Sequence, residues 1–244
     1  MNRIPLALRV SLIAICAALY AALGYASYLG LFTPVIGVVR FWPVVFVPAV
    51  FSLAFDPLIG GLGAAIGIFI SDMIIHGNAL LSLWAGVPAN FMCFFISGLR
   101  GPRRKELGMI IGAIINFLVV ALCLLSGQLG LLPEPIAVTY ALATAVALAI
   151  PLVMGIKVRK WMGYYAMGSL GLLIGASWIG IMVWAFSQIF VLPSGEMRLP
   201  LMAALAWMLW VYCTEIPFML LLPPPVVEAL RRGLPPGVVR REEI

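Results

Sequence analysis

The feature that most constrains this chain is a series of long apolar runs. The first covers residues 6–29 and contains a single charged residue, Arg9. A membrane-spanning helix needs about 20 predominantly apolar residues. Only helices and closed barrels satisfy their backbone hydrogen bonds in hydrocarbon, and these runs lack the alternating pattern of barrel strands. The sequence therefore predicts an all-α integral membrane protein.

Composition excludes a soluble globular protein. Of the 244 residues, 64% are hydrophobic and 10% are charged, whereas soluble domains have about 45–50% and about 25%. The net charge of +6 does not indicate a nucleic-acid partner, because the basic residues lie between and beyond the apolar runs, where topology signals lie. Four cysteines without metal-binding spacing lie inside apolar runs, which predicts buried thiols rather than disulfides: Cys16, Cys93, Cys123 and Cys213.

Proline, glycine and charged residues divide the chain into eight predicted helices. Their ranges are 6–29, 42–55, 58–76, 82–99, 107–126, 135–156, 163–192 and 199–222. The first exceeds a signal-peptide core, so we interpret it as a retained helix. We expect one transmembrane domain over 1–222 and a cytoplasmic tail over 223–244. A bundle of six to eight spanning helices is predicted, because one helix pair could be re-entrant or interfacial.

The basic residues predict the topology. If the N-terminus is cytoplasmic and the number of spans between basic clusters is even, thirteen of the 15 Lys and Arg residues lie inside and two, Arg40 and Arg198, lie outside. Such a bias is the signature of cytoplasmic loops. The inside group is Arg3, Arg9, Arg100, Arg103, Arg104, Lys105, Lys157, Arg159, Lys160, Arg231, Arg232, Arg240 and Arg241. We expect both termini to be cytoplasmic in a multi-pass protein of the plasma membrane.

A stripe of small residues lies on one face of the first predicted helix. Its members are Ala14, Ala17, Ala18, Ala21 and Gly24. Small residues let helix backbones approach closely in lipid, where no hydrophobic force drives association. Two interpretations stay open: packing against another helix of this chain, or a face that binds a partner protein.

The segment that follows carries the most information. Residues 40–43 read Arg-Phe-Trp-Pro, followed by a short apolar helix, the turn Asp56-Pro57, and a Gly- and Ala-rich helix that ends at Ser71-Asp72. This order resembles the substrate-binding S component of energy-coupling factor (ECF) vitamin transporters. The alanines of the first helix resemble that family's alanine motif, and residues 215–232 resemble its closing helix more weakly. The specific similarity covers about residues 6–100.

The resemblance implies a subunit that captures a small metabolite outside and docks on a transmembrane coupling subunit, with ABC-type ATPase subunits supplying the energy. The partner-binding residues implied are Ala14, Ala18, Ala21 and Ala22. Eight helices are more than such S components usually have, so we expect an inserted hairpin between residues 107 and 192. The chain begins Met-Asn-Arg and lacks the Met-x-His hook of nickel and cobalt members, so no metal cargo is expected.

Asp72 and His76 are four residues apart and share a helix face. Zinc sites need at least three protein ligands, and His76 is the only histidine, so we expect no metal site. Two interpretations stay open: a helix-end pair at the membrane surface, or a contact with cargo.

Further polar and aromatic residues lie at the same predicted outer end. Trp42 and Trp84 offer stacking faces, whereas Arg40, Asp72 and Asn90 offer hydrogen bonds. We predict one pocket there for a ring-containing, vitamin-like metabolite. The predicted substrate-binding residues are Arg40, Trp42, Asp72, His76, Asn78, Trp84 and Asn90.

Glu215 stands alone in an apolar helix. An ionised carboxylate in the membrane is costly and is expected to face the bundle interior or a cavity. Two other interpretations stay open: a protonated acid bonded to a backbone carbonyl freed by Pro217, and a helix end that reaches the headgroups.

Three classes of function compete. The chain has no Walker A pattern, so ATP-driven work would come from partners. An intramembrane enzyme is not expected, because the sequence has no GxSxG or HExxH pattern. No cofactor is expected. The alternative to a capture subunit is a self-sufficient secondary transporter, although that class favours internal repeats and several midplane charges.

The predicted topology can be tested by cysteine labelling. In a background without the four native cysteines, single cysteines at positions 104 and 159 should resist an impermeant thiol reagent in whole cells, because both loops are predicted to be cytoplasmic. A cysteine at position 196 should react. Strong labelling of position 104 from outside would contradict the topology.

Overall fold

The computed structural model describes residues 5–31, 35–36, 39–153, 156–235 and 238–240, and nearly all of this part is helical. Six of its helices are long and apolar enough to cross a membrane, and two shorter apolar helices, Pro43–Ala54 and Glu134–Ile150, lie among them. The predicted all-α membrane bundle is confirmed.

Its elements are α1 (Leu6–Ala26), a π-helical turn (Ser27–Leu31), β1 (Val35–Ile36), β2 (Val39–Arg40), a 3-10 turn (Pro43–Val45), α2 (Phe46–Ala54), α3 (Pro57–Ile75), α4 (Ala79–Leu81), a π-helical turn (Ser82–Gly86), α5 (Val87–Ser97), α6 (Lys105–Gln128), α7 (Glu134–Val153), a 3-10 turn (Ile156–Trp161), α8 (Met162–Ile189), α9 (Met202–Leu221) and α10 (Pro223–Gly233).

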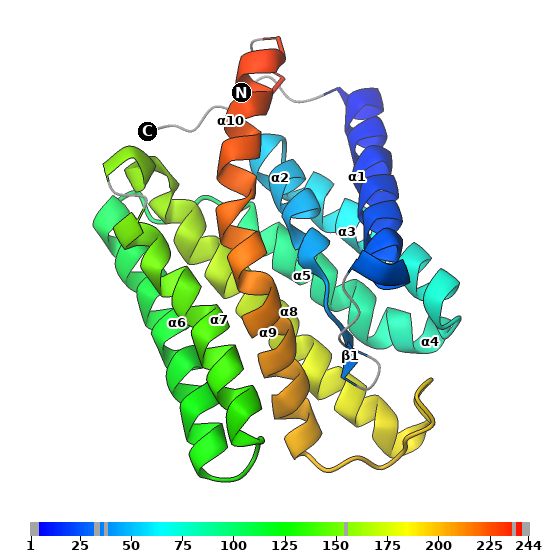
Figure 1. Ribbon diagram of the computed structural model, residues 1–244. Coiled ribbons are helices and arrows are strands. Elements are labelled where there is room, and N and C mark those ends of the chain that lie inside the picture. The colour runs from blue at the N-terminus through cyan, green and yellow to red at the C-terminus, as the bar shows by residue number, and fades with distance from the viewer. Residues whose placement is uncertain (1–4, 32–34, 37–38, 154–155, 236–237, 241–244) are drawn as a thin grey trace.

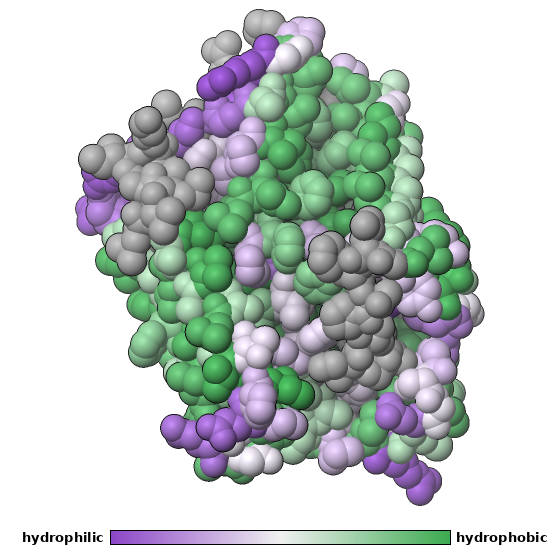
Figure 2. Space-filling model, viewed as in Figure 1, coloured by the Kyte–Doolittle hydropathy of each residue, from purple (hydrophilic) through white to green (hydrophobic). Residues whose placement is uncertain are grey.

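The outer surface is apolar between two more polar ends (Figure 2). Helix α3 shows the pattern, because every fourth residue from Leu58 onward is a large aliphatic residue that is 38% to 55% exposed. The row consists of Leu58, Leu62, Ile66, Ile70 and Ile74. Such a contiguous exposed ridge suits contact with lipid chains and not with water.

One end of the bundle carries most of the basic residues. Figure 1 shows α10, the start of α1 and the end of α2 at this end. The 98–104 loop and the Ile156–Trp161 turn connect helices at the same end. This is the grouping that the predicted topology requires, while its assignment to the cytoplasm stays a prediction.

Small residues set the distances between helices. An added methyl group at Gly67 of α3 would lie 2.8 Å from the carbonyl oxygen of Ala17 in α1. Likewise, a methyl group at Gly175 of α8 would lie 2.9 Å from Cβ of Cys93 and 3.1 Å from the carbonyl oxygen of Ala89, both in α5. The backbones of these helices are therefore in near contact, which is how helices associate in lipid.

The small-residue stripe of α1 divides into two faces. Cys16, Ala17 and Ala21 are buried against the bundle, and the hydroxyl group of Ser71 donates a hydrogen bond to the carbonyl oxygen of Ala21 at 3.4 Å. In contrast, Ala14, Ala18 and Ala22 are exposed, four residues apart. Ala21 was predicted to be a partner-binding residue. It lies instead on the buried face of α1 and is only 6% exposed.

Helices α6 and α7 form a hairpin beside α8 and α9, within the range where an inserted hairpin was expected (Figure 1). The buried Asn116 of α6 joins three helices. Its amide nitrogen donates to Ser169 Oγ of α8 at 2.9 Å, and its Oδ1 accepts from the hydroxyl group of Tyr212 of α9 at 3.1 Å. Tyr165 of α8 also donates to the carbonyl oxygen of Ala147 in α7 at 3.1 Å.

The chain after residue 222 continues as α10, which packs against α2. Farther on, the backbone N–H of Arg240 donates to the carbonyl oxygen of Ala54 at 2.6 Å, where α2 ends. Nη1 of the same arginine donates to the carbonyl oxygen of Gly98 at 3.0 Å. The described part of the predicted tail is therefore attached to the bundle at its basic end.

Replacing Asn116 by alanine should loosen the hairpin. The change removes two inter-helix hydrogen bonds inside an apolar bundle, so we expect unfolding to become easier by about 1 to 2 kcal/mol. The midpoint of thermal unfolding in detergent measures this. Thr139→Ala on α7 is the control, because that exposed hydroxyl group bonds only within its own helix, to Pro135. Equal midpoints for Asn116→Ala and Thr139→Ala would contradict the assignment.

Candidate ligand-binding cavity

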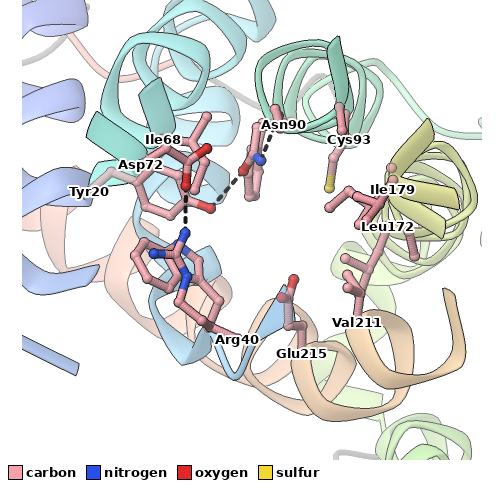
Figure 3. Close-up of a pocket in the computed structure, with 18 of the residues that line it drawn as sticks. Tyr20, Arg40, Ile68, Asp72, Asn90, Cys93, Leu172, Ile179, Val211 and Glu215 are labelled. Atoms are coloured by element: carbon pink, nitrogen blue, oxygen red, sulfur yellow. Dashed lines mark hydrogen bonds and ion pairs between the residues drawn. The ribbon is translucent and has the colours of Figure 1, made fainter. Parts of the chain in front are cut away.

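A cavity opens at the end of the bundle opposite α10. It contains about 770 Å³ of empty space, counting its open mouth. Helices α1, α3, α5, α8 and α9 and the residues just before α2 contribute its walls, and Figure 3 shows the polar side chains on one side and aliphatic ones on the other. None of the described residues of the α6–α7 hairpin lines it. The aliphatic wall consists of Leu172, Ile179, Val183 and Val211, and Ile68 lies beside Asp72 on the polar side.

Asp72, in the last turn of α3, is the centre of a buried polar cluster. Its Oδ1 lies 2.5 Å from Nη2 of Arg40 and 3.4 Å from Nε2 of His76. Its Oδ2 accepts a hydrogen bond from Ser82 Oγ at 2.7 Å. A methyl group at Gly86 would lie 2.9 Å from Oδ2, so this position has no room for a side chain. The negative charge of Asp72 is therefore compensated within the protein.

The strand pair β1–β2 brings Arg40 to the cavity. Val35 pairs with Arg40 in this short antiparallel ladder, and the chain then turns into α2. The guanidinium carbon of Arg40 lies 5.1 Å from the centre of the Trp42 ring, a distance at which a cation is attracted to the ring face. Nη1 of Arg40 is buried and has no hydrogen-bond partner among the described residues. This donor is available to a bound molecule.

Tyr20 and Asn90 link α1 to α5 across the cavity wall. The Tyr20 hydroxyl group donates to Oδ1 of Asn90 at 2.7 Å, and Nδ2 of Asn90 donates to the carbonyl oxygen of Gly86 at 2.9 Å. The Tyr20 ring meets Trp42 and Phe94 edge-on, with centroids 6.0 Å and 5.8 Å apart. These contacts fix the side chains before any ligand binds, which lowers the entropy cost of binding.

Glu215 on α9 points into the cavity from the side opposite Asn90 (Figure 3). It is only 7% exposed. No hydrogen bond or ion pair joins its carboxyl group to another residue in the described part of the chain. Of the three interpretations of Glu215, this geometry favours the cavity-facing one. An uncompensated carboxyl group in such a place is costly unless a ligand or a proton neutralises it.

Five of the seven predicted substrate-binding residues line this one cavity: Arg40, Trp42, Asp72, His76 and Asn90. Asn78 does not line it, because its Oδ1 caps α4 by accepting a hydrogen bond from the N–H of Leu81 at 2.9 Å. Trp84 does not line it either. It lies in the π-helical turn with 40% of its surface exposed, and its carbonyl oxygen accepts from Nε1 of Trp178 at 3.3 Å.

Glu215 and Tyr20 also line the cavity, although neither was predicted from the sequence as a substrate-binding residue. Both lie in helices that are apolar on every face, so the sequence does not show which face points inward. The signal in the sequence that could have placed Glu215 in the site is its isolated carboxylate in an apolar helix.

The cavity has no donor set for a resident metal. Among the described residues, no group of three or more His, Cys, Asp or Glu side chains could hold a metal ion. Comparisons with models of known protein families, with characterised proteins and with solved structures found no match.

Truncation of the polar anchors should weaken binding of the small molecule that co-purifies with the protein. Asp72→Ala removes the partner that positions Arg40, and Asn90→Ala removes the partner that positions Tyr20. Loss of such a buried hydrogen bond costs about 1 to 3 kcal/mol, so each change should raise the dissociation constant about 5- to 150-fold. Isothermal titration of the purified protein measures this. Glu134→Ala is the control, because Glu134 is exposed at the start of α7. Wild-type affinity in both cavity variants would show that the site lies elsewhere.

Proposed function

We propose that this chain is the membrane-embedded capture subunit of an ECF-type importer in the plasma membrane. In this proposal it binds a small, ring-containing, vitamin-like metabolite at the outer face and performs no chemistry on it. The observation that carries the proposal is the cavity at the end opposite the basic residues, in which a few buried polar groups face an aliphatic wall. Such a mixture is typical of sites for small molecules.

Two charged groups of the cavity, which keep unfilled hydrogen-bonding positions among the described residues, define the cargo that would fit. The Glu215 carboxyl group requires a hydrogen-bond donor or a positive charge, whereas Nη1 of Arg40 requires an acceptor. Asp72 is already paired with Arg40, so Glu215 is the acidic group left for the ligand. We infer a nitrogen heterocycle that has an N–H or amino group toward Glu215 and a carbonyl oxygen or ring nitrogen toward Arg40.

The exposed alanine row of α1 supports the expected coupling partner. Ala14, Ala18 and Ala22 form a row of small, exposed side chains on the outside of the bundle, where a second transmembrane protein could approach closely. The cavity lies on the inner side of the same helix, through Tyr20. Partner docking and cargo binding would therefore use opposite faces of α1. The ATPase subunits would bind through this partner.

Glu215 is also the feature that favours the alternative, a self-sufficient secondary transporter. A buried carboxyl group in a membrane helix can take up and release a proton during transport. Uptake into liposomes that contain only this chain distinguishes the two. Accumulation driven by a proton gradient without ATP would favour the transporter, and uptake that needs the coupling subunit and ATP would favour the importer.

Ala18→Trp should prevent docking without affecting the cavity. A bulky ring on the exposed row holds a partner helix away, so co-purification of the coupling subunit and uptake in cells should fall at least about 10-fold, the equivalent of about 1.4 kcal/mol. Cargo binding by the isolated chain should stay unchanged. The control Leu142→Trp, at a 65% exposed position of α7, should leave the complex intact. Normal complex formation by Ala18→Trp would contradict the proposed partner face.

A further inference from the structure

Two cysteines from different helices meet inside the bundle. The sulfur atoms of Cys123 on α6 and Cys213 on α9 lie 3.6 Å apart, which is direct contact. Both side chains are fully buried, and the structure holds both as free thiols. Neither residue lines the proposed cargo cavity, so the proposed function leaves this pair of thiols unexplained.

Contacts at two levels hold α6 and α9 in register around the pair. Asn116 lies two turns before the first cysteine, and its Oδ1 accepts a hydrogen bond from Tyr212, which directly precedes the second cysteine. Helix α7 packs against both α6 and α9. The rings of Tyr140 on α7 and Trp210 on α9 have their centres 6.0 Å apart, one turn before the second cysteine. The fold therefore keeps the two sulfur atoms close together.

The two sulfur atoms are within reach of a covalent bond. Bonded sulfur atoms are about 2.0 Å apart, so the pair has to close by about 1.5 Å, which small rotations of both side chains supply. The other two cysteines have different surroundings. Cys16 packs against Gly63 of α3, and Cys93 lines the cargo cavity. They serve as internal controls for thiols that share the same membrane but not this contact.

We propose that Cys123 and Cys213 form a disulfide under oxidising conditions and so tie the α6–α7 hairpin to α9. One cysteine attacks an external disulfide and forms a mixed disulfide, and the other then displaces the remaining half of the reagent. Two S–H bonds of the protein break and one S–S bond forms, while the external disulfide takes up two electrons and two protons and leaves as two thiols.

The position of the pair suits this reaction. Cys123 lies five residues before the end of α6, and the predicted topology places that end outside, where disulfides persist. Its neighbours Leu124 and Leu125 are 43% and 49% exposed on the surface of the hairpin, so an apolar oxidant dissolved in lipid can approach this part of α6. Glu215 follows Cys213 by two residues, so the bond would hold the helix that carries the proposed ligand group.

Oxidation of the purified full chain in detergent by dipyridyl disulfide, a small apolar reagent, tests the proposal. The reaction is stopped with acid, the protein is denatured, and mass spectrometry of its peptides identifies every bonded sulfur. We expect one bond within the chain, between Cys123 and Cys213, with no reagent on either residue. Cys16 and Cys93 should be found as thiols or as adducts of the reagent. Free thiols or adducts at all four cysteines, a different pairing, or bonds only between chains would overturn the proposal.

The midpoint of thermal unfolding tests whether the bond restrains the hairpin. The bond joins residues 90 positions apart and limits the freedom of the unfolded chain, so the oxidised wild type should unfold about 5 °C or more above the reduced protein. Dithiothreitol should reverse the shift. Cys123→Ala should show neither bond nor shift, whereas the matched control Cys16→Ala should show both. Equal midpoints for oxidised and reduced wild type would contradict the proposed tie.

Discussion

The absence of water inside the bilayer is the constraint on which this structure depends. Every buried polar group must find a partner within the bundle or remain costly. Asp72 meets this condition through Arg40, His76 and Ser82, and Asn116 meets it through Ser169 and Tyr212. Glu215 does not. The polar groups that have partners within the bundle, such as those of Asp72 and Asn116, stabilise the fold. The carboxyl group of Glu215 is the one that we infer is available to a ligand.

Close packing of small residues complements this constraint. Glycines on α3 and α8 bring helix backbones together, and α8 contacts α5, α6 and α9. The bundle thus has a rigid wall on one side of the cavity and the short β1–β2 pair with Arg40 on the other. The α6–α7 hairpin packs outside this wall and contributes no lining residue in the described part of the chain. The two ends of the described structure differ: the cavity at one end contains Glu215, whose carboxyl group has no partner among the described residues, and basic side chains gather at the other end.

Much of the fold was predictable because the signals are local. Each of the eight predicted ranges corresponds to a helical segment of the structure, since Pro, Gly and charged residues mark the ends of apolar runs in lipid. The turn Asp56-Pro57 shows this well: Asp56 caps α3 by accepting a hydrogen bond from the N–H of Leu58.

Orientation about the helix axis was less predictable. Ala21 and Trp84 were assigned to the wrong faces, because helices surrounded by lipid and by other helices are apolar all round and give little indication of their inner side. The π-helical turn at Ser82–Gly86 adds to the difficulty at Trp84, since a 3.6-residue period does not describe it. Five of the seven predicted substrate-binding residues nevertheless line the cavity, because polar residues at the outer ends of membrane helices are expected to face the bundle interior or a cavity.

The central claim is that the outer cavity holds a nitrogen-containing ring compound against Glu215. Mass spectrometry of small molecules released from the purified, denatured chain tests it most directly, with Glu215→Gln and Glu134→Gln measured beside the wild type. We predict that one such compound is enriched in wild type and in Glu134→Gln at about one molecule per chain, and that it is lost from Glu215→Gln because the neutral amide is a weaker hydrogen-bond acceptor than a carboxylate and carries no counter-charge. Equal recovery of the compound from Glu215→Gln, or enrichment of a purely aliphatic or acidic compound, would contradict the account.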